Sequence, residues 1–454
     1  MHCKKFCFLI LIAFTNIHSC KKMEFKKERQ LTTDLTYNHD LDNNDNFSPD
    51  DQWLVYDTRT EKGGIGGNAT IEKVHVATGK KKLLYHLDKN TAYGPGVGAV
   101  SYSHTENKVA FIHGLMNSSK DNPYEQWRRT GIILDENQLD KPIFMDARDV
   151  ESPFTPGALR GGTHRHEWSG DGKFIGFTYN DAIMKQLEDS TGAILNLRTI
   201  GVSKADSKVI IDPENPGNFS GDWFSTLVVE VVPEPQPGSD QISRAAGDSW
   251  VGTHGYTDRN GKKQRARGFI GTVKNSDGQN VDEVYIVDIP EDITLPSEKG
   301  LLQGTESDLP SPPKGASQSR LTFTGKTEQP GCEGIVRSSL DGAWLAYLAY
   351  DQNHIKQVFC ISPSGDQTIQ VSFHKSDVQS GVRWHSSEHK IIYVQNNSVI
   401  QRDIHSEGFE VLTEPSDNAP TNLVWSHDGK TIAYNRLVEN EEGVSTKQIF
   451  LLEL

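Results

Sequence analysis

The sequence predicts an all-β protein folded as a seven-bladed β-propeller. Three observations predict it: a short phrase that returns along the chain, a scarcity of helix signals, and 40 Gly and 20 Pro that punctuate short apolar runs. In this blade phrase an apolar strand enters a tight turn, usually Asp-Gly, and a second apolar strand follows. Clear copies occupy 47–56, 168–177, 338–347 and 425–434, and degraded copies occupy 102–111 and 384–393. A hairpin repeated at such spacing is typical of a radial array.

Each repeat can supply the four strands of one blade. The inner strands are predicted to enter their turns near Phe47, Tyr102, Trp168, Tyr256, Ser338, Trp384 and Trp425. The fourth turn is harder to recognise, because residues 256–261 resemble a longer version of the Asp-Gly turn. The last blade has only three strands in sequence. We expect a strand at 29–32 to complete it, because closing the ring in this way removes an open sheet edge.

Two stretches lie outside this predicted pattern. Residues 214–250 are predicted to be an insertion between blades three and four, and they are apolar and aromatic enough to carry function. Residues 291–318 are predicted to be a Pro/Ser-rich surface loop. Cys332 and Cys360 fall in one blade with a strand between them, so we expect two buried free thiols.

The N-terminal segment has the pattern of a lipoprotein-type signal peptide, residues 1–20. A basic start precedes an apolar stretch at 6–14, and Cys20 follows a small residue. That stretch is shorter than the roughly 20 residues that span a bilayer. We predict a lipidated Cys20, a tether at 21–28 and a single propeller at 29–454, in the periplasm or at the outer membrane of a bacterium. The lipid would be its sole membrane contact, and plain secretion is the alternative.

The charge of the chain argues against nucleic acid as a partner. It has 47 Lys and Arg against 61 Asp and Glu, a formal net charge of -14 at pH 7. Such an acidic surface repels phosphate backbones. The sequence also has no Gly-x-Ser-x-Gly elbow and no phosphate-binding Gly loop before a helix. We therefore expect neither an appended hydrolase domain nor a nucleotide site, and we expect a monomer.

A His-x-His pair gives the sharpest chemical signal. His164 and His166 lie two residues apart on a predicted strand, so both side chains would face one side and could converge on one ion. Aligning Tyr256 of blade four on Trp168 of blade three places His254 at the register of His166. These three histidines are the predicted ligands of a divalent metal (Mn, Zn or Ca). The alternative is a polar channel lining with each His hydrogen-bonded to backbone.

Basic and aromatic side chains near this pair predict an anion site. The planar guanidinium of arginine matches a carboxylate or sulfate. The candidate catalytic residues are His164, His166, Arg160 and Arg244. The candidate substrate-binding residues are Arg165, Asp222, Trp223 and Trp250, with Glu167 as a further candidate. The alternatives are surface salt bridges for the arginines and core packing for the tryptophans.

The blade phrase, fourth strands such as Arg320-Leu321-Thr322, and the export signal resemble TolB-like propellers. Segments 157–166, 238–244 and 283–288 resemble the YidR-like family of uncharacterised propellers. Oligogalacturonate lyases are a further similar group. That resemblance implies a divalent metal held by His side chains and cleavage of acidic sugar chains by β-elimination. The lyases add a Gln ligand three residues before their paired His, where this chain has Gly161.

Two functions from different classes are expected. The first is an exported lipoprotein that binds an anionic oligosaccharide at the channel mouth between blades three and four, with metal- or His-assisted cleavage as an enzymatic option. The second is a non-catalytic TolB-like module that binds a protein of the cell envelope.

Overall fold

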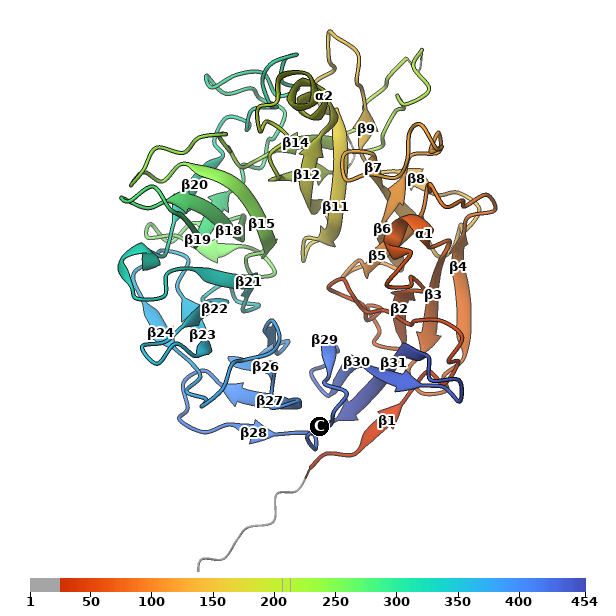
Figure 1. The fold of residues 1–454 in the computed structure, drawn as a ribbon, viewed down its shortest axis with the longest axis vertical. Coiled ribbons are helices and arrows are strands. Elements are labelled where there is room, and N and C mark those ends of the chain that lie inside the picture. The colour runs from red at the N-terminus through yellow and green to blue at the C-terminus, as the bar shows by residue number, and fades with distance from the viewer. Residues whose placement is uncertain (1–24, 206, 213) are drawn as a thin grey trace, which may run out of the picture.

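Antiparallel sheets are arranged around one axis like the blades of a propeller (Figure 1). The computed structural model describes residues 25–205, 207–212 and 214–454, so the predicted signal peptide and Cys20 lie outside the described residues. Seven sheets radiate from the axis, which confirms the predicted seven-bladed propeller. No helix among the described residues is long and apolar enough to cross a membrane.

The first four blades follow each other along the chain. Blade one contains β2 (Trp53–Asp57), β3 (Thr70–His75) and β4 (Lys81–His86). Blade two contains β5 (Val97–Tyr102), β6 (Lys108–Gly114), β7 (Arg129–Asp135) and β8 (Ile143–Phe144). Blade three contains β11 (Gly161–Trp168), β12 (Phe174–Asp181), β13 (Thr199–Lys204) and β14 (Phe224–Leu227). Blade four contains β15 (Ile242–Trp250), β18 (Ala266–Lys274), β19 (Asn280–Asp288) and β20 (Ser317–Arg320).

The last three blades complete the ring. Blade five contains β21 (Cys332–Ser338), β22 (Leu345–Tyr350), β23 (Lys356–Ile361) and β24 (Thr368–Gln370). Blade six contains β25 (Arg383–Trp384), β26 (Lys390–Gln395), β27 (Ser398–Asp403) and β28 (Glu410–Val411). Blade seven contains β29 (Thr421–Trp425), β30 (Thr431–Glu439), β31 (Ser445–Glu453) and β1 (Glu28–Gln30).

Short elements lie in the loops within and between the blades. They are α1 (Gly64–Gly67), the parallel pair β9 (Ala147–Arg148) and β10 (Ala158–Leu159), α2 (Ala182–Thr191), the hairpin β16 (Tyr256–Thr257) and β17 (Lys263–Gln264), and η1 (Thr324–Lys326). Helix α2 begins where the carboxylate of Asp181 accepts the amides of Ile183 and Met184 (both 2.9 Å). It ends at Gly192, whose φ of 76° suits glycine.

The N-terminal strand closes the ring, as the sequence predicts. β1 pairs antiparallel with β31, with Arg29 opposite Leu451. The carboxylate of Glu28 pairs with Arg436 (2.8 Å) and accepts a hydrogen bond from Tyr434. β1 therefore begins one residue before the predicted start of the propeller, and it covers the edge that β31 would otherwise leave open.

The turn of the blade phrase owes its shape to a serine and an aspartate. In blade three, Ser169 Oγ donates to Asp171 (2.6 Å) and accepts the amide of Phe174 (3.0 Å), while Gly172 has a φ of 71°. The same Ser-to-Asp hydrogen bond recurs in blades one, five and seven. These aspartates therefore shape turns, which explains why the phrase recurs so faithfully.

The predicted start of blade four is wrong. Residues 214–250 are not an insertion, because they contain β14, the outer strand of blade three, and β15, the inner strand of blade four. Trp250 pairs with Arg267 at the place where Trp168 pairs with Ile175. Residues 256–264 form an extra hairpin, in which Asp258 accepts two backbone amides of its own turn. That turn imitates the blade phrase, which explains the error in the predicted register.

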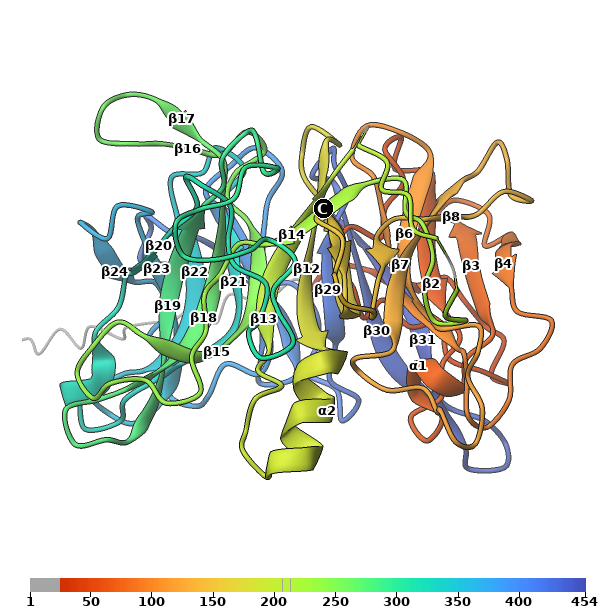
Figure 2. The same ribbon diagram turned by 90° about the horizontal axis from the view of Figure 1, so that it is seen from above.

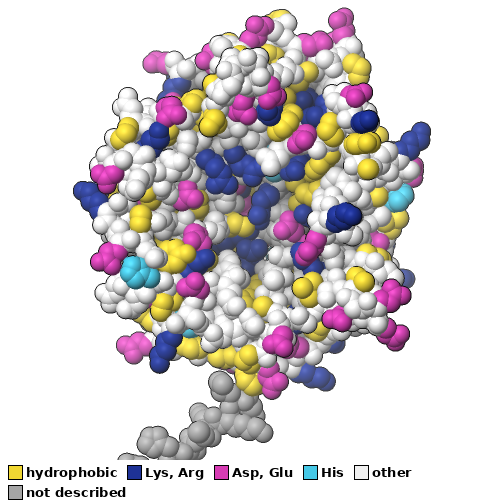
Figure 3. All heavy atoms as spheres, in the orientation of Figure 1, with side chains coloured by type: hydrophobic (Ala, Val, Ile, Leu, Met, Phe, Trp, Pro, Cys, Tyr) yellow, Lys and Arg dark blue, Asp and Glu magenta, His cyan; other side chains and the backbone are white. Residues whose placement is uncertain are grey.

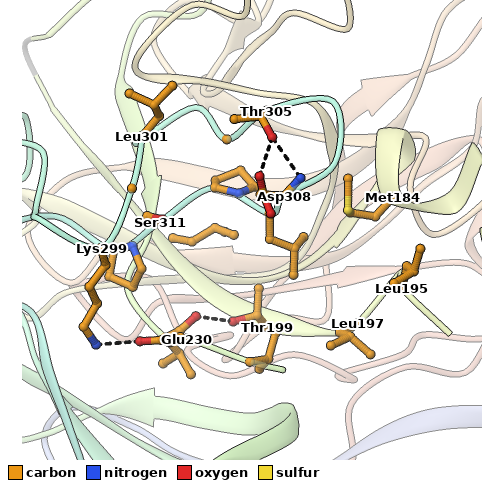
Figure 4. A pocket seen from close by; sticks show the side chains of 18 of the residues that line it. Met184, Leu195, Leu197, Thr199, Glu230, Lys299, Leu301, Thr305, Asp308 and Ser311 are labelled. Carbon is orange, nitrogen blue, oxygen red and sulfur yellow. Dashed lines mark hydrogen bonds and ion pairs between the residues drawn. The ribbon is translucent and has the colours of Figure 1, made fainter. Parts of the chain in front are cut away.

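The prediction of two buried free thiols is confirmed, and the predicted loop 291–318 is confirmed as far as residue 316, because β20 begins at Ser317. Residues 291–316 contain turns but no named strand, and they pack over the outside of blade three. A cavity of about 460 Å³ lies between this loop and the segment around α2, with Lys299 and Glu230 paired at one side (Figure 4). Cys332 and Cys360 are free and buried, and β22 lies between their strands.

The propeller has two distinct faces. Helix α2 projects from one, and the β16–β17 hairpin projects from the other (Figure 2). We call them the helix face and the turn face. The inner strands run from the first to the second, so β11 begins with Gly161 at the helix face and ends with Trp168 at the turn face.

Candidate anion-binding site

The paired histidines of blade three do not face the same side. A β-bulge interrupts the pairing of β11 with β12 between His164 and Glu167, and Arg165 inside it has a φ of 53°. A bulge adds a residue to one strand and breaks the regular alternation of side chains. His166 consequently turns toward blade two and packs against Gly131 of β7, and its Nε2 lies 2.9 Å from Thr163 Oγ1 of its own strand. Only in a regular strand would residues 164 and 166 face the same side.

The third predicted metal ligand lies on the opposite face. His254 is exposed in the segment that leads to β16 at the turn face. Asp248, not His254, is the residue of blade four that stands two places before the tryptophan of its inner strand. The three histidines are therefore not brought together. Within the described residues, no group of three or more His, Cys, Asp or Glu side chains is placed to hold a metal ion.

His164 instead joins two arginines in a hydrogen-bond network. Arg129 Nη1 lies 2.8 Å from His164 Nδ1, and His164 Nε2 lies 3.3 Å from Asn180 Oδ1. Arg198 Nε donates to the same Asn180 oxygen (3.1 Å), and its Nη2 donates to Gln126 (3.0 Å). Because a guanidinium only donates, Nδ1 of His164 must accept and Nε2 must carry the proton.

Burial and positive neighbours set the charges of this network. Burial, followed by the charges of Arg129 and Arg198, holds the pKa of His164 well below its ordinary value. Burial lowers the pKa of His166 to about 3. Both rings are therefore neutral at pH 7. Burial, followed by the charges of Arg244 and Arg129, lowers the pKa of Arg198 to about 10, which still leaves it charged.

Four arginines around the channel mouth have no carboxylate within ion-pair distance in the part of the chain that the structure describes. They are Arg129, Arg165, Arg198 and Arg244, whereas Arg160, Arg267 and Arg337 are paired. Lys and Arg side chains gather around the central hollow of the helix face (Figure 3). Unpaired guanidinium groups that repel one another favour an anion, which would relieve that repulsion.

A hollow of about 590 Å³ opens beside these arginines, where blades three and four meet on the helix face. Its volume falls in the range of about 300 to 1,000 Å³ typical of ligand sites. Asn180, Arg198 and Arg244 supply polar groups, and Ile194 and Pro233 supply apolar surface. This is the region where the sequence analysis expects the channel-mouth site, although most of the side chains that form it differ from the predicted ones.

Arg160 lies away from the site and has a structural role. It is fully buried, it pairs with Asp181 (3.0 Å), and it donates to the carbonyls of Thr305 and Asp308. These contacts fasten loop 291–316 to blade three. The donors of Arg160 are thus engaged with the protein, so the structure does not offer it to a substrate.

The predicted aromatic and acidic residues also lie elsewhere. Trp223 packs edge-on against Trp168 in the core between blades two and three, at 5.7 Å between ring centroids. Asp222 pairs with Lys208 (3.1 Å). Trp250 Nε1 donates to the carbonyl of Glu167 (2.9 Å) near the turn face. The positions of the two tryptophans agree with the alternative of core packing.

Glu167 is the centre of a buried ion-pair cluster. Its two carboxylate oxygens pair with Arg267 (3.0 Å) and Arg337 (2.8 Å), and Arg267 also pairs with Asp248. The cluster links the inner strands of blades three, four and five. Glu167 is therefore neutralised by the protein itself.

Sequence reasoning missed Arg129, Asn180, Arg198 and Gln126. None of them belongs to the blade phrase or to a recognisable motif. The four residues share one feature, their place in the fold. Each lies at the helix-face end of a strand or in the loop beside it. Such ends of rigid strands commonly carry binding residues, but a single sequence does not show which of the strand ends meet.

The fold and the site together define a β-propeller protein with an arginine-rich channel mouth. The chain is 36% identical over 405 residues to "Uncharacterized protein YidR" of Escherichia coli (strain K12), a match that covers 87% of this chain and 92% of that protein. It therefore belongs to the YidR family. A family described as "Protein of unknown function (DUF3748)" matches residues 96–219, the part that contains Arg129, His164 and Arg198.

Solved structures of other propellers resemble this fold. An oligogalacturonate lyase in complex with manganese has a TM-score of 0.54 at 10% identity and covers 94% of this chain and 93% of its own. The oligogalacturonate lyase from Vibrio parahaemolyticus has a TM-score of 0.52 at 11% identity, with the same coverage. TolB from Acinetobacter baumannii has a TM-score of 0.33 at 11% identity over 91% of this chain and 85% of its own. At such identities the two lyases show a shared fold alone.

Proposed function

We propose that this protein binds an acidic oligosaccharide at the channel mouth on the helix face. The observation that carries the proposal is the set of four arginines, Arg129, Arg165, Arg198 and Arg244, that have no carboxylate partner among the described residues. The chain as a whole is acidic, with a formal net charge of -14. A local positive mouth on a negative protein attracts anions to that place and repels them elsewhere.

The hollow between blades three and four suits a carboxylated sugar chain. Arg198 and Arg244 lie on its lining and would hold carboxylates, each by the two parallel donors of a guanidinium. Ile194 and Pro233 offer apolar surface for sugar rings. Asn180 and Gln126 supply neutral polar groups for hydroxyls, although both already bond to Arg198.

Cleavage of the chain by β-elimination is the enzymatic extension of this proposal. A base removes the proton next to the sugar carboxylate, the electron pair forms a C=C bond, and the glycosidic C–O bond breaks as its oxygen takes up a proton, which the protonated base can return. His164 is neutral and lies beside Arg129, so it can act as that base once Arg129 turns to the substrate. Arg129 would then stabilise the charge that develops on the carboxylate.

A divalent metal does not fit the residues that the sequence suggests for it. The Nδ1 lone pair of His164 accepts from a cationic guanidinium, and His166 is turned into the interface of blades two and three. The proposal therefore contains no metal-dependent step. Elemental analysis of the purified protein checks this point, and one equivalent of bound manganese, zinc or calcium would contradict it.

Isothermal titration with oligogalacturonate tests the binding proposal, with a neutral oligosaccharide as reference. Wild-type protein is expected to bind the acidic chain, and Arg198→Ala together with Arg244→Ala is expected to weaken binding by roughly a hundredfold, as two lost charge-assisted contacts imply. Arg259→Ala is the matched control, because Arg259 is exposed and paired with Asp366 away from the helix face. Ultraviolet detection of unsaturated products tests cleavage.

Failure to bind any acidic oligosaccharide would favour the second candidate, a non-catalytic module that binds a protein of the cell envelope. The structure offers one observation for a binding role without catalysis, since both ring nitrogens of His164 are engaged in hydrogen bonds. Pull-down from membranes, compared between the wild type and the double arginine variant, would separate the two candidates.

The location in the cell is part of the same proposal. We infer an exported lipoprotein in the periplasm or at the outer membrane, anchored by Cys20 after removal of the signal peptide. Cell fractionation tests it: wild-type protein should stay with membranes, and Cys20→Ser protein should not. Equal distribution of both proteins would contradict the lipid anchor.

A further inference from the structure

A second cavity lies on the propeller axis at the turn face. Its volume is about 340 Å³, and all seven blades contribute to its wall. The contributing residues include Phe47, His104, Trp168, Trp250, Ser338, Trp384 and Trp425. It is separate from the helix-face hollow, because Arg244 and Trp250 lie six residues apart on β15, a span of about 20 Å along a strand.

Tryptophans dominate the wall of this cavity. Four of the eight tryptophans of the chain line it, each from the end of an inner strand. Trp250 Nε1 donates to Glu167 O and Trp384 Nε1 donates to Arg337 O (2.8 Å), so these two indoles tie neighbouring blades together. Large aromatic faces at one end of a channel favour a ligand with a flat or ring-shaped apolar surface.

Two of these indoles have unsatisfied donors. Trp168 is 2% exposed and Trp425 is 8% exposed, yet neither Nε1 has a hydrogen-bond acceptor among the described residues. Buried polar groups nearly always have a partner, and exceptions need an explanation. Both nitrogens are shielded from solvent, so a molecule in the cavity would meet the apolar surfaces of these indoles and not their N–H groups.

The charged groups of the cavity leave one cation available. Glu167 is neutralised by Arg267 and Arg337, and Asp45 lies 3.4 Å from His104. Arg383 is different: its Nε donates to Leu423 O (2.8 Å) and its Nη1 to Val382 O (3.4 Å), and no carboxylate of the described chain pairs with it. Its guanidinium lines the cavity, and an anion bound there would offset the burial and the positive charges of Arg337 and Arg165 that lower the pKa of Arg383.

We propose that the turn-face cavity is a second binding site, which takes a small carboxylate carried on a six-membered ring. The carboxylate pairs with Arg383, and the ring lies against the apolar surfaces of the four indoles. A uronic acid monosaccharide and an aromatic carboxylate share this chemistry. The site is independent of oligosaccharide binding on the helix face, since no side chain of one hollow lines the other.

Intrinsic tryptophan fluorescence tests this site, because half of the tryptophans line the cavity. D-glucuronate and benzoate are the two probes, and D-glucose and cyclohexanol are their uncharged counterparts. We expect a saturable change with at least one of the two acids and none with the counterparts. A response to glucuronate identifies a sugar acid as the ligand class, and a response to benzoate identifies an aromatic acid.

Three variants assign the response to the cavity. Arg383→Gln removes the charge and is expected to weaken binding by roughly tenfold or more. Ser386→Phe fills the cavity without removing an observed hydrogen bond, so it should abolish the response even if Arg383→Gln folds poorly. Arg244→Gln alters only the helix-face hollow and should leave the response unchanged. No saturable response to either acid, or a response that survives both cavity variants, would overturn the proposal.

Discussion

Arg129 Nη1 lies 2.8 Å from Nδ1 of His164, and this contact determines the chemistry of the channel mouth. It occupies the lone pair that a metal would need and places a positive charge beside the ring. Together with burial it keeps His164 neutral at pH 7. The sequence predicts a metal site at His164 and His166. In the folded chain, His164 instead belongs to an arginine-rich anion site.

Buried His166 makes the stability of the protein sensitive to acid. Its pKa is about 3 in the folded protein because of burial, against an ordinary value of 6.5. As the pH drops, the unfolded chain protonates His166 at a higher pH than the folded chain does. The contribution of neutral His166 to stability is therefore fully present above pH 6.5 and is lost as the pH falls from 6.5 toward 3. Within that window, the free energy of unfolding falls by about 1.4 kcal/mol per pH unit because of this one histidine.

The variant His166→Gln isolates this contribution. Its free energy of unfolding, measured by urea denaturation from pH 7 to pH 4, should fall less steeply than that of the wild type. The difference between the two slopes should be about 1 kcal/mol per pH unit. Parallel curves would show that His166 does not titrate as its burial implies.

The Glu167 cluster should contribute strongly to the stability of the ring. Glu167→Gln removes a buried charge between Arg267 and Arg337, and it leaves Arg337 without its carboxylate. Breaking a buried ion pair in this way costs about 3–5 kcal/mol. The control is Glu291→Gln, because Glu291 is an exposed partner of Arg265 and should change stability by less than about 1 kcal/mol. Chemical denaturation of both variants distinguishes these effects.

Arg160 should hold loop 291–316 against blade three. Arg160→Ala removes its contacts with the carbonyls of Thr305 and Asp308 and leaves Asp181 buried without its partner. We expect faster proteolysis within 291–316 and a loss of about 3 kcal/mol or more in unfolding free energy. Limited proteolysis followed by mass spectrometry locates the cuts. If the first cuts fall in other loops, at wild-type rates, Arg160 does not fasten this segment.

The N-terminal clasp should protect an open sheet edge. Deletion through Gln30 removes β1 and exposes the edge of β31, whereas deletion through Phe25 keeps the clasp intact. We expect the longer deletion to lower the melting temperature and to promote self-association, because an unpaired edge strand can pair with another copy. Size-exclusion chromatography with light scattering measures the association state. A stable monomer without β1 would show that the clasp is dispensable.

Much of the fold follows from local chemistry that a sequence displays. The serine and aspartate of each blade phrase bond to each other and to nearby amides, so the turn needs few distant contacts. That explains why the blade order, the N-terminal clasp and the separation of Cys332 from Cys360 can be predicted. The exception is blade four, where the turn of Asp258 carries the same local signal without being the blade turn.

The site depends on contacts that local sequence does not encode. The bulge at Arg165 rotates His166 away from His164, and the sequence of these three residues does not predict a bulge. Arg129 and His164 are 35 residues apart, and they meet only because blades two and three pack side by side.

The sequence by itself determined that the described chain is a ring of hairpin blades closed by its first strand, because periodic apolar strands and self-contained turns are local properties. The tertiary structure alone decided which polar groups meet: His164 with Arg129, Arg160 with its loop, and four indoles around one axial cavity. Those encounters depend on strand register and on the packing of neighbouring blades, which join residues from distant parts of the chain.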